Sequence, residues 1–126
     1  MNLLSLFENS RHIEEFPAGT TIFAEGTPGD LLYVILTGKI EVSLQGELLD
    51  TLGPGDIVGE MALIDASTRS ATAVAKSDCR LAVIDERRFL YMVQETPYFS
   101  LHVMRVLVQR LRRTLDIAGR ANWGKP

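Results

Sequence analysis

The sequence predicts a mainly β fold: a jelly-roll β-barrel of about eight strands, with a short N-terminal helix and two C-terminal helices. Two observations carry this. Ile40, Val42 and Leu44 alternate with polar residues, the period-two pattern of a half-buried strand. The triplet Pro-Gly-Asp occurs twice, at residues 28–30 and 54–56, where Pro then Gly suits the centre of a type II turn. Short strands between such corners are typical of sandwiches and barrels.

The remaining strands are predicted from other short apolar runs that are separated by turn residues. Gly38 and Gly46 stand where tight turns require a positive φ. The runs occupy residues 20–23, 31–36, 70–75 and 79–84.

Helices are predicted on both sides of this body. Leu3, Leu4, Leu6 and Phe7 indicate a short first helix. Residues 86–94 follow Asp85, which is a suitable N-cap. A third helix is predicted to begin at Thr96-Pro97, because proline is tolerated at the first helical position, and to end at Gly119.

Length and composition favour one domain, residues 1–126. With 126 residues and 46% hydrophobic side chains, the chain can bury one sizeable core. Within it we expect an N-terminal helical element (1–15), a β-roll (16–85) and closing helices (86–119). Neither a membrane span nor a secretion signal is recognisable. A single cysteine, Cys79, fits a reducing, cytoplasmic setting.

Charge is distributed unevenly along the chain. Residues 1–100 hold 7 basic and 15 acidic side chains, whereas residues 101–126 hold 6 basic side chains and one acidic. The overall charge of −3 argues against a general nucleic-acid binder. The basic end is interpreted as a solvated helix face, with a surface for an acidic partner or for nucleic acid as the alternative.

An apolar stripe follows the last predicted helix at alternating spacings of three and four. This spacing is that of an a/d seam, which predicts either packing against the barrel or a homodimer through paired helices. Its members are Leu101, Met104, Val108, Leu111, Leu115 and Ala118.

The stretch VGEMALIDASTRSATAVA, residues 58–75, places one acid and one base among small residues. Glu60 directly follows Gly59, where a helix start would expose free backbone N–H groups that suit an anion. Arg69 can offer a guanidinium to the same anion, while ionised Glu60 accepts from a hydroxyl or amine. Together they describe a sugar-phosphate site, although a plain Glu60–Arg69 salt bridge fits the spacing as well.

GEMALIDASTRSATAVA closely resembles the phosphate-binding cassette of the cyclic nucleotide-binding domain family, and the likeness extends through FPAGTTIFAEGTPGDLLYVILTGKIEVSL and LGPGDIVGE. The resemblance implies a non-catalytic sensor that binds a cyclic nucleotide and signals through its C-terminal helices. It implies that Glu60 binds the ribose 2′-hydroxyl and that Arg69 pairs with the cyclic phosphate.

Further residues are assigned by the same resemblance. Gly59 and the backbone near Met61 and Ala62 would cradle the phosphate and sugar, and the hydroxyl of Ser70 would add a phosphate hydrogen bond. Thr114 matches a threonine that contacts the adenine amino group in bacterial activators. We favour cAMP over cGMP, although Ser70 leaves that choice open.

Other function classes are less well supported by the residues. A metal-dependent enzyme on this fold would require converging histidines, and the chain has only His12 and His102, outside the predicted strands. We therefore expect no catalytic residue, no metal and no cofactor. The alternative is a nucleotide-independent protein-interaction scaffold. Because the chain stops soon after the last predicted helix, no DNA-binding domain and no membrane part is expected in it.

Overall fold

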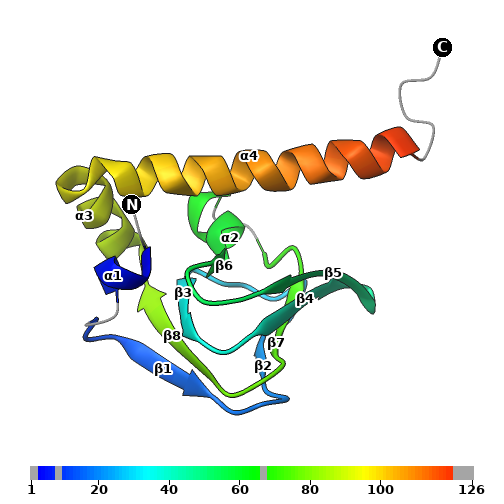
Figure 1. Ribbon diagram of the computed structural model, residues 1–126, viewed down its shortest axis with the longest axis horizontal. Helices are drawn as coiled ribbons and strands as arrows, with labels where there is room; N and C mark the ends of the chain where they lie inside the picture. Colours follow the sequence, from blue (N-terminus) through cyan, green and yellow to red (C-terminus); the bar gives the residue numbers. More distant parts are fainter. Residues whose placement is uncertain (1–2, 8–9, 66–67, 121–126) are drawn as a thin grey trace. The chain divides into compact units, whose positions relative to one another are not determined.

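The computed structural model describes residues 3–7, 10–65 and 68–120 (Figure 1). They divide into two compact units, one ending at Tyr91 and the other beginning at Met92. The elements, in chain order, are α1 (Leu3–Phe7), β1 (Ile13–Phe16), β2 (Thr21–Phe23), β3 (Leu32–Thr37), β4 (Ile40–Leu44), β5 (Glu47–Leu52), β6 (Ile57–Val58), α2 (Glu60–Asp65), β7 (Thr72–Ala75), β8 (Cys79–Ile84), α3 (Glu86–Glu95) and α4 (Pro97–Arg120).

The described strands form two antiparallel four-stranded sheets, which confirms the predicted fold class. One sheet has the order β1-β8-β3-β6 and the other β2-β7-β4-β5. Strands far apart in sequence are therefore neighbours: Leu81 of β8 pairs with Glu14 on one side and Ile35 on the other. Figure 1 shows the two sheets facing each other, with β6 leading into α2.

The core lies between the sheets and centres on β3. Leu32, Val34 and Ile35 are fully buried, and the burial extends to Leu36. Both faces of this strand are covered, because α1 and α2 also contact β3. This explains why the run 31–36 is continuously apolar instead of alternating. Ile40 and Leu81, both fully buried, continue the core on β4 and β8.

The turns follow the sequence prediction with one exception. Gly38, Gly46 and Gly55 have positive φ values of 93°, 84° and 90°. Gly29, in the first Pro-Gly-Asp triplet, does not have a positive φ, so the type II turn predicted there is wrong. Because it has no side chain, Gly29 instead leaves room for the side chain of Arg69.

Some strands begin elsewhere than predicted or were not predicted. β1 begins at Ile13, ahead of the expected start of the β-roll at Phe16, because its residues pair along β8. β5 had no sequence prediction, and β6 was expected only as a strand of unstated length before Gly59. β5 is largely exposed, and β6 has two residues, so neither shows a clear periodicity.

The C-terminal helices begin where the sequence predicts. The Oδ1 atom of Asp85 accepts a hydrogen bond from the backbone N–H of Arg88 at 2.8 Å, which confirms the N-cap of α3. α4 begins at Pro97 and continues to Arg120, past the predicted end at Gly119. A glycine costs a helix only about 1 kcal/mol, which is too little to end one by itself.

Part of the apolar stripe of α4 can be described. The side chains of Met104, Val108 and Leu111 are 53%, 46% and 58% exposed, and Leu101 is half-buried. The side chains of Leu115 and Ala118 lie outside the described residues. Among the helices that the structure describes, none has the length and apolar character needed to cross a membrane.

Candidate functional site

The cassette predicted from the sequence lies where β6 ends and α2 begins. Gly59 has a φ of 86°, which lets the chain turn out of β6 so that Glu60 becomes the first residue of α2. Arg69 lies beyond α2 and before β7. Glu60 and Arg69 are 3% and 5% exposed, and within the described part of the chain they are the only charged side chains that are buried.

The backbone of Arg69 is fixed to the loop that follows β2. Its N–H donates to the carbonyl of Thr27 at 2.8 Å, and its own carbonyl accepts from the N–H of Gly26 at 2.8 Å. Thr68 forms an isolated bridge with Pro28. These bonds join two segments that are about forty residues apart in sequence and place the arginine side chain inside the roll.

The guanidinium of Arg69 is held by contacts that leave part of it unpaired. Its Nη1 atom donates to the carbonyl of Gly59 at 3.1 Å. Its Cζ atom lies 4.1 Å from the centre of the Phe23 ring, a cation–π arrangement. Its Nε atom is buried and has no hydrogen-bond partner in the part of the chain that the structure describes. A buried donor without an acceptor is costly, so this atom is suited to an anionic ligand.

Two glycines allow the arginine to lie this close to the backbone. A Cβ added at Gly59 would lie 2.7 Å from Nη1 of Arg69, and one added at Gly29 would overlap Nε, Cζ and Cδ of the same side chain. In the first Pro-Gly-Asp triplet, glycine is therefore needed because it leaves room for the Arg69 side chain, and not because of its backbone conformation.

An aromatic cluster lines the site and was not predicted from the sequence. The rings of Phe23 and Tyr33 are stacked, with centroids 6.3 Å apart and an interplanar angle of 19°. Phe16 meets Tyr33 edge to face at 6.2 Å. These residues belong to β1, β2 and β3, so their proximity depends on the folded arrangement of the sheets and not on any sequence spacing.

The electrostatics of the site reflect its burial. Burial lowers the pKa of Arg69, and the nearby Tyr33, Asp30 and Glu60 oppose that shift. Burial also raises the pKa of the Tyr33 phenol above its ordinary value of 10.0. A guanidinium keeps its proton in proteins, so Arg69 is a permanent buried cation. Asp30 and Tyr33 are two further residues of the site that sequence reasoning missed.

The other predicted site residues are placed less completely. Met61 is exposed on α2, and the hydroxyl of Ser70 lies 3.5 Å from its sulfur atom. Ala62 lies in α2 and Thr114 in α4, but their side chains lie outside the described residues. No group of three His, Cys, Asp or Glu side chains that could hold a metal occurs among the residues described.

Comparison with known proteins identifies the class of protein to which this fold and site belong. Residues 13–96 match the model of the cyclic nucleotide-binding domain, and the chain belongs to that family.

Among its relatives is the CRP-like cAMP-activated global transcriptional regulator of Mycobacterium tuberculosis, which is 36% identical over 105 residues. The match covers 79% of this chain and 47% of the regulator, so the chain spans about half the length of this relative.

Solved structures show the same likeness. The Thermus thermophilus catabolite activator protein superposes with a TM-score of 0.76 and 32% identity, over 86% of this chain and 55% of that one. The EAL enzyme Bd1971 is similar in both its cGMP-bound form (TM-score 0.65, 37% identity, 85% of this chain and 30% of that one) and its cAMP-bound form (TM-score 0.62, 36% identity, 88% and 31%).

Proposed function

We propose that the β-roll binds one cyclic nucleotide, with Arg69 holding the cyclic phosphate and Glu60 accepting a hydrogen bond from the ribose 2′-hydroxyl. The observation that carries the proposal is the buried guanidinium of Arg69, whose Nε atom has no partner among the described residues. Family membership supports the same ligand. A nucleotide-independent scaffold would gain nothing from an arginine buried in this way, because burying it disfavours the folded state.

The chemistry of the two charged residues matches the two ends of such a ligand. The cyclic phosphate carries one negative charge and would supply the acceptor that Nε of Arg69 lacks. Gly59, Met61 and Ala62 supply backbone at the start of α2, and the exposed Ser70 hydroxyl can turn from Met61 to the phosphate. Charge-assisted hydrogen bonds contribute about 1.5–3 kcal/mol each, and micromolar affinity requires about 8 kcal/mol in total.

We favour cAMP over cGMP as the physiological ligand. The regulator of M. tuberculosis is described as cAMP-activated, which supports this order. The EAL enzyme Bd1971, part of which is similar to this chain, has been solved in a cGMP-bound and a cAMP-bound form, so both ligands are tested below. On α4, Thr114 is proposed to contact the adenine amino group.

We further propose a regulatory, non-catalytic role in which ligand occupancy moves α3 and α4. The stripe on α4, residues 101, 104, 108, 111, 115 and 118, is proposed to pair with a second copy of the chain. The exposure of Met104, Val108 and Leu111 supports this, because large apolar side chains on one helix face are characteristic of interfaces.

The experiment that tests the proposal is isothermal titration of the chain with cAMP and, separately, with cGMP. Arg69→Ala is expected to abolish saturable binding, whereas Arg80→Ala should retain it. Arg80 is a matched control: it is an exposed arginine on β8 whose Nε atom lies 3.8 Å from Glu15. Absence of binding by the wild-type chain to either nucleotide would leave the scaffold as the better interpretation.

A further inference from the structure

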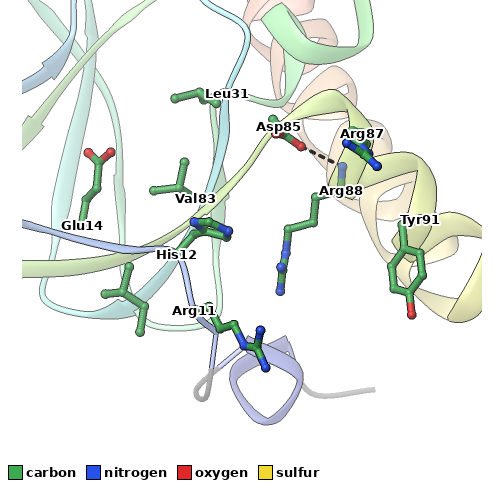
Figure 2. Close-up of a pocket in the computed structure, with 10 residues that line it drawn as sticks. Arg11, His12, Glu14, Leu31, Val83, Asp85, Arg87, Arg88 and Tyr91 are labelled. Atoms are coloured by element: carbon green, nitrogen blue, oxygen red, sulfur yellow. Dashed lines mark hydrogen bonds between the residues drawn. The ribbon is translucent and has the colours of Figure 1, made fainter.

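A second pocket, separate in its residues from the cassette, lies within residues 11–91. It has a volume of about 530 Å³ and is formed by the chain entering β1, the residue before β3, the end of β8 and the start of α3 (Figure 2). None of the cassette residues lines it. Its volume is that of a pocket for a small organic molecule, for which about 300–1,000 Å³ is usual.

Basic side chains are concentrated around this pocket, although the part of the chain that forms it is acidic overall. Residues 2–91 contain 7 Arg and Lys side chains against 14 Asp and Glu. Three of those seven, Arg11, Arg87 and Arg88, line this one pocket. Within the described residues none of the three forms an ion pair, whereas Lys76 and Arg80 do. Glu14 and Asp85 line the same pocket, so the positive charge there is only partly offset.

Among the three arginines of the pocket, Arg88 gives the most specific indication that a ligand binds there. Its Nε atom is buried, and in the described part of the chain it has no hydrogen-bond partner. Asp85, the nearest acid in sequence, already accepts from the backbone N–H of Arg88. Figure 2 shows the Arg88 side chain extending from α3 toward the segment that holds Arg11 and His12. Arg69 of the cassette is the only other described residue with a buried, unpartnered side-chain donor.

The opposite wall of the pocket is partly apolar. Leu31 and Val83 are half-buried there. The exposed Tyr91 lies on α3, on the same side as Arg87 and Arg88 (Figure 2). Figure 2 places Leu31 and Val83 on the strand side and the arginines on the helix side and below. A ligand that fits both walls therefore has an anionic end and an apolar or ring-shaped body.

We propose that this pocket binds a small organic phosphate, with the phosphate held by Arg88 and assisted by Arg11 and Arg87. Guanidinium groups bind phosphate oxygens in pairs. The lining sets three arginines against the two carboxylates Glu14 and Asp85, so a net charge of +1 (3 − 2) remains to attract the phosphate. The body of the ligand would lie against Leu31 and Val83. An acidic protein segment is the less favoured occupant, because the pocket has the volume of a small-molecule site.

The test uses phenyl phosphate as the probe, because it combines a phosphate with an apolar ring. It is titrated into the full chain carrying Arg69→Ala, so that the cassette arginine cannot compete, and the arginine Nε–Hε resonances are followed by NMR. Saturable shifts at Arg88 are expected. Arg88→Gln should weaken binding roughly tenfold or more, as expected for the loss of a charge-assisted hydrogen bond. Arg80→Gln, with the same change of charge outside the pocket, should leave the affinity unchanged.

Folding of each variant is checked by circular dichroism, and Arg11→Gln provides a second variant at an exposed residue outside any helix or strand. Equal affinity in Arg88→Gln and Arg80→Gln, or no saturable shift, would overturn the proposal. Saturable binding of a glutamate-rich peptide, together with no binding of phenyl phosphate, would overturn the proposal in favour of a protein partner. The outcome does not depend on cyclic nucleotide binding, which the Arg69→Ala background removes.

Discussion

The Cζ atom of Arg69 lies 4.1 Å from the centre of the Phe23 ring, so a buried cation rests on an aromatic face in the candidate site. The ring stacks in turn on Tyr33, which fixes its orientation. This relationship links a residue of the cassette to a strand that precedes it by more than forty positions.

Phe23→Leu should therefore weaken cyclic nucleotide binding while preserving the fold. Leucine keeps the apolar volume but removes the π face, which contributes about 0.5–2 kcal/mol to a cation–π contact. Titration calorimetry should show a several-fold weaker affinity. Phe16→Leu is the matched control, because Phe16 packs on Tyr33 without contacting the guanidinium in the described structure. Equal effects of the two variants would mean that the contact with Arg69 is unimportant.

Gly29→Ala should abolish cyclic nucleotide binding by a steric clash alone. A Cβ at this position would overlap the Arg69 side chain and force it away from the Gly59 carbonyl. Gly53→Ala is the control, because a Cβ there meets nothing within 4 Å and Gly53 has no positive φ. Calorimetric titration with cAMP measures both. Wild-type affinity in Gly29→Ala would show that the arginine has another productive position.

Glu60 is tested by combining a protein variant with a ligand variant. Glu60→Gln and removal of the 2′-hydroxyl, in 2′-deoxy-cAMP, should each weaken binding about tenfold, because each loses one charge-assisted hydrogen bond. If the two groups contact each other, the double change should cost little more than either single change. Fully additive losses of binding free energy would mean that the ribose 2′-hydroxyl does not contact Glu60.

Alkaline pH should destabilise the chain in part through Tyr33. Burial raises the pKa of its phenol, so its contribution to the free energy of unfolding is complete below 10.0 and is lost as the pH rises through the higher folded value. Burial of the Cys79 thiol acts with the same sign, from 9.0 upward. Urea unfolding at increasing pH should show a falling stability that is less steep in Tyr33→Phe. Identical slopes in the two chains would exclude Tyr33 as a source.

Val108→Glu on the α4 stripe should shift the chain toward monomer if this face pairs with a second copy. A charge at an a/d position is strongly unfavourable in a helix pair. Analytical ultracentrifugation measures the change, and Gln109→Glu, on an exposed neighbouring position, is the control. A monomeric wild-type chain would refute the homodimer.

The sequence was sufficient for the fold class and for the two charged residues of the cassette, because both depend on local patterns. Residues 40–44 alternate, and Gly59-Glu60 and Arg69 belong to one short motif. Phe23 and Tyr33 could not be predicted as part of the site, because their contact depends on which strands come together. Gly29 was misassigned since a turn glycine and a glycine that makes room for a side chain look alike in sequence. The ligand-contacting roles of Glu60, Arg69 and Thr114 remain predictions.

The backbone hydrogen bonds from Arg69 to Gly26 and Thr27 have a consequence for how the chain tolerates changes in length. They make the loop between β2 and β3 part of the candidate site, so an inserted residue there would move the arginine. The β4–β5 turn at Gln45 and Gly46 is exposed. The β4–β5 turn is tied to that same loop, because the backbone N–H of Gln45 donates to the Glu25 carboxylate at 3.1 and 3.2 Å. Peptide tags or reporter groups should therefore be placed in neither segment.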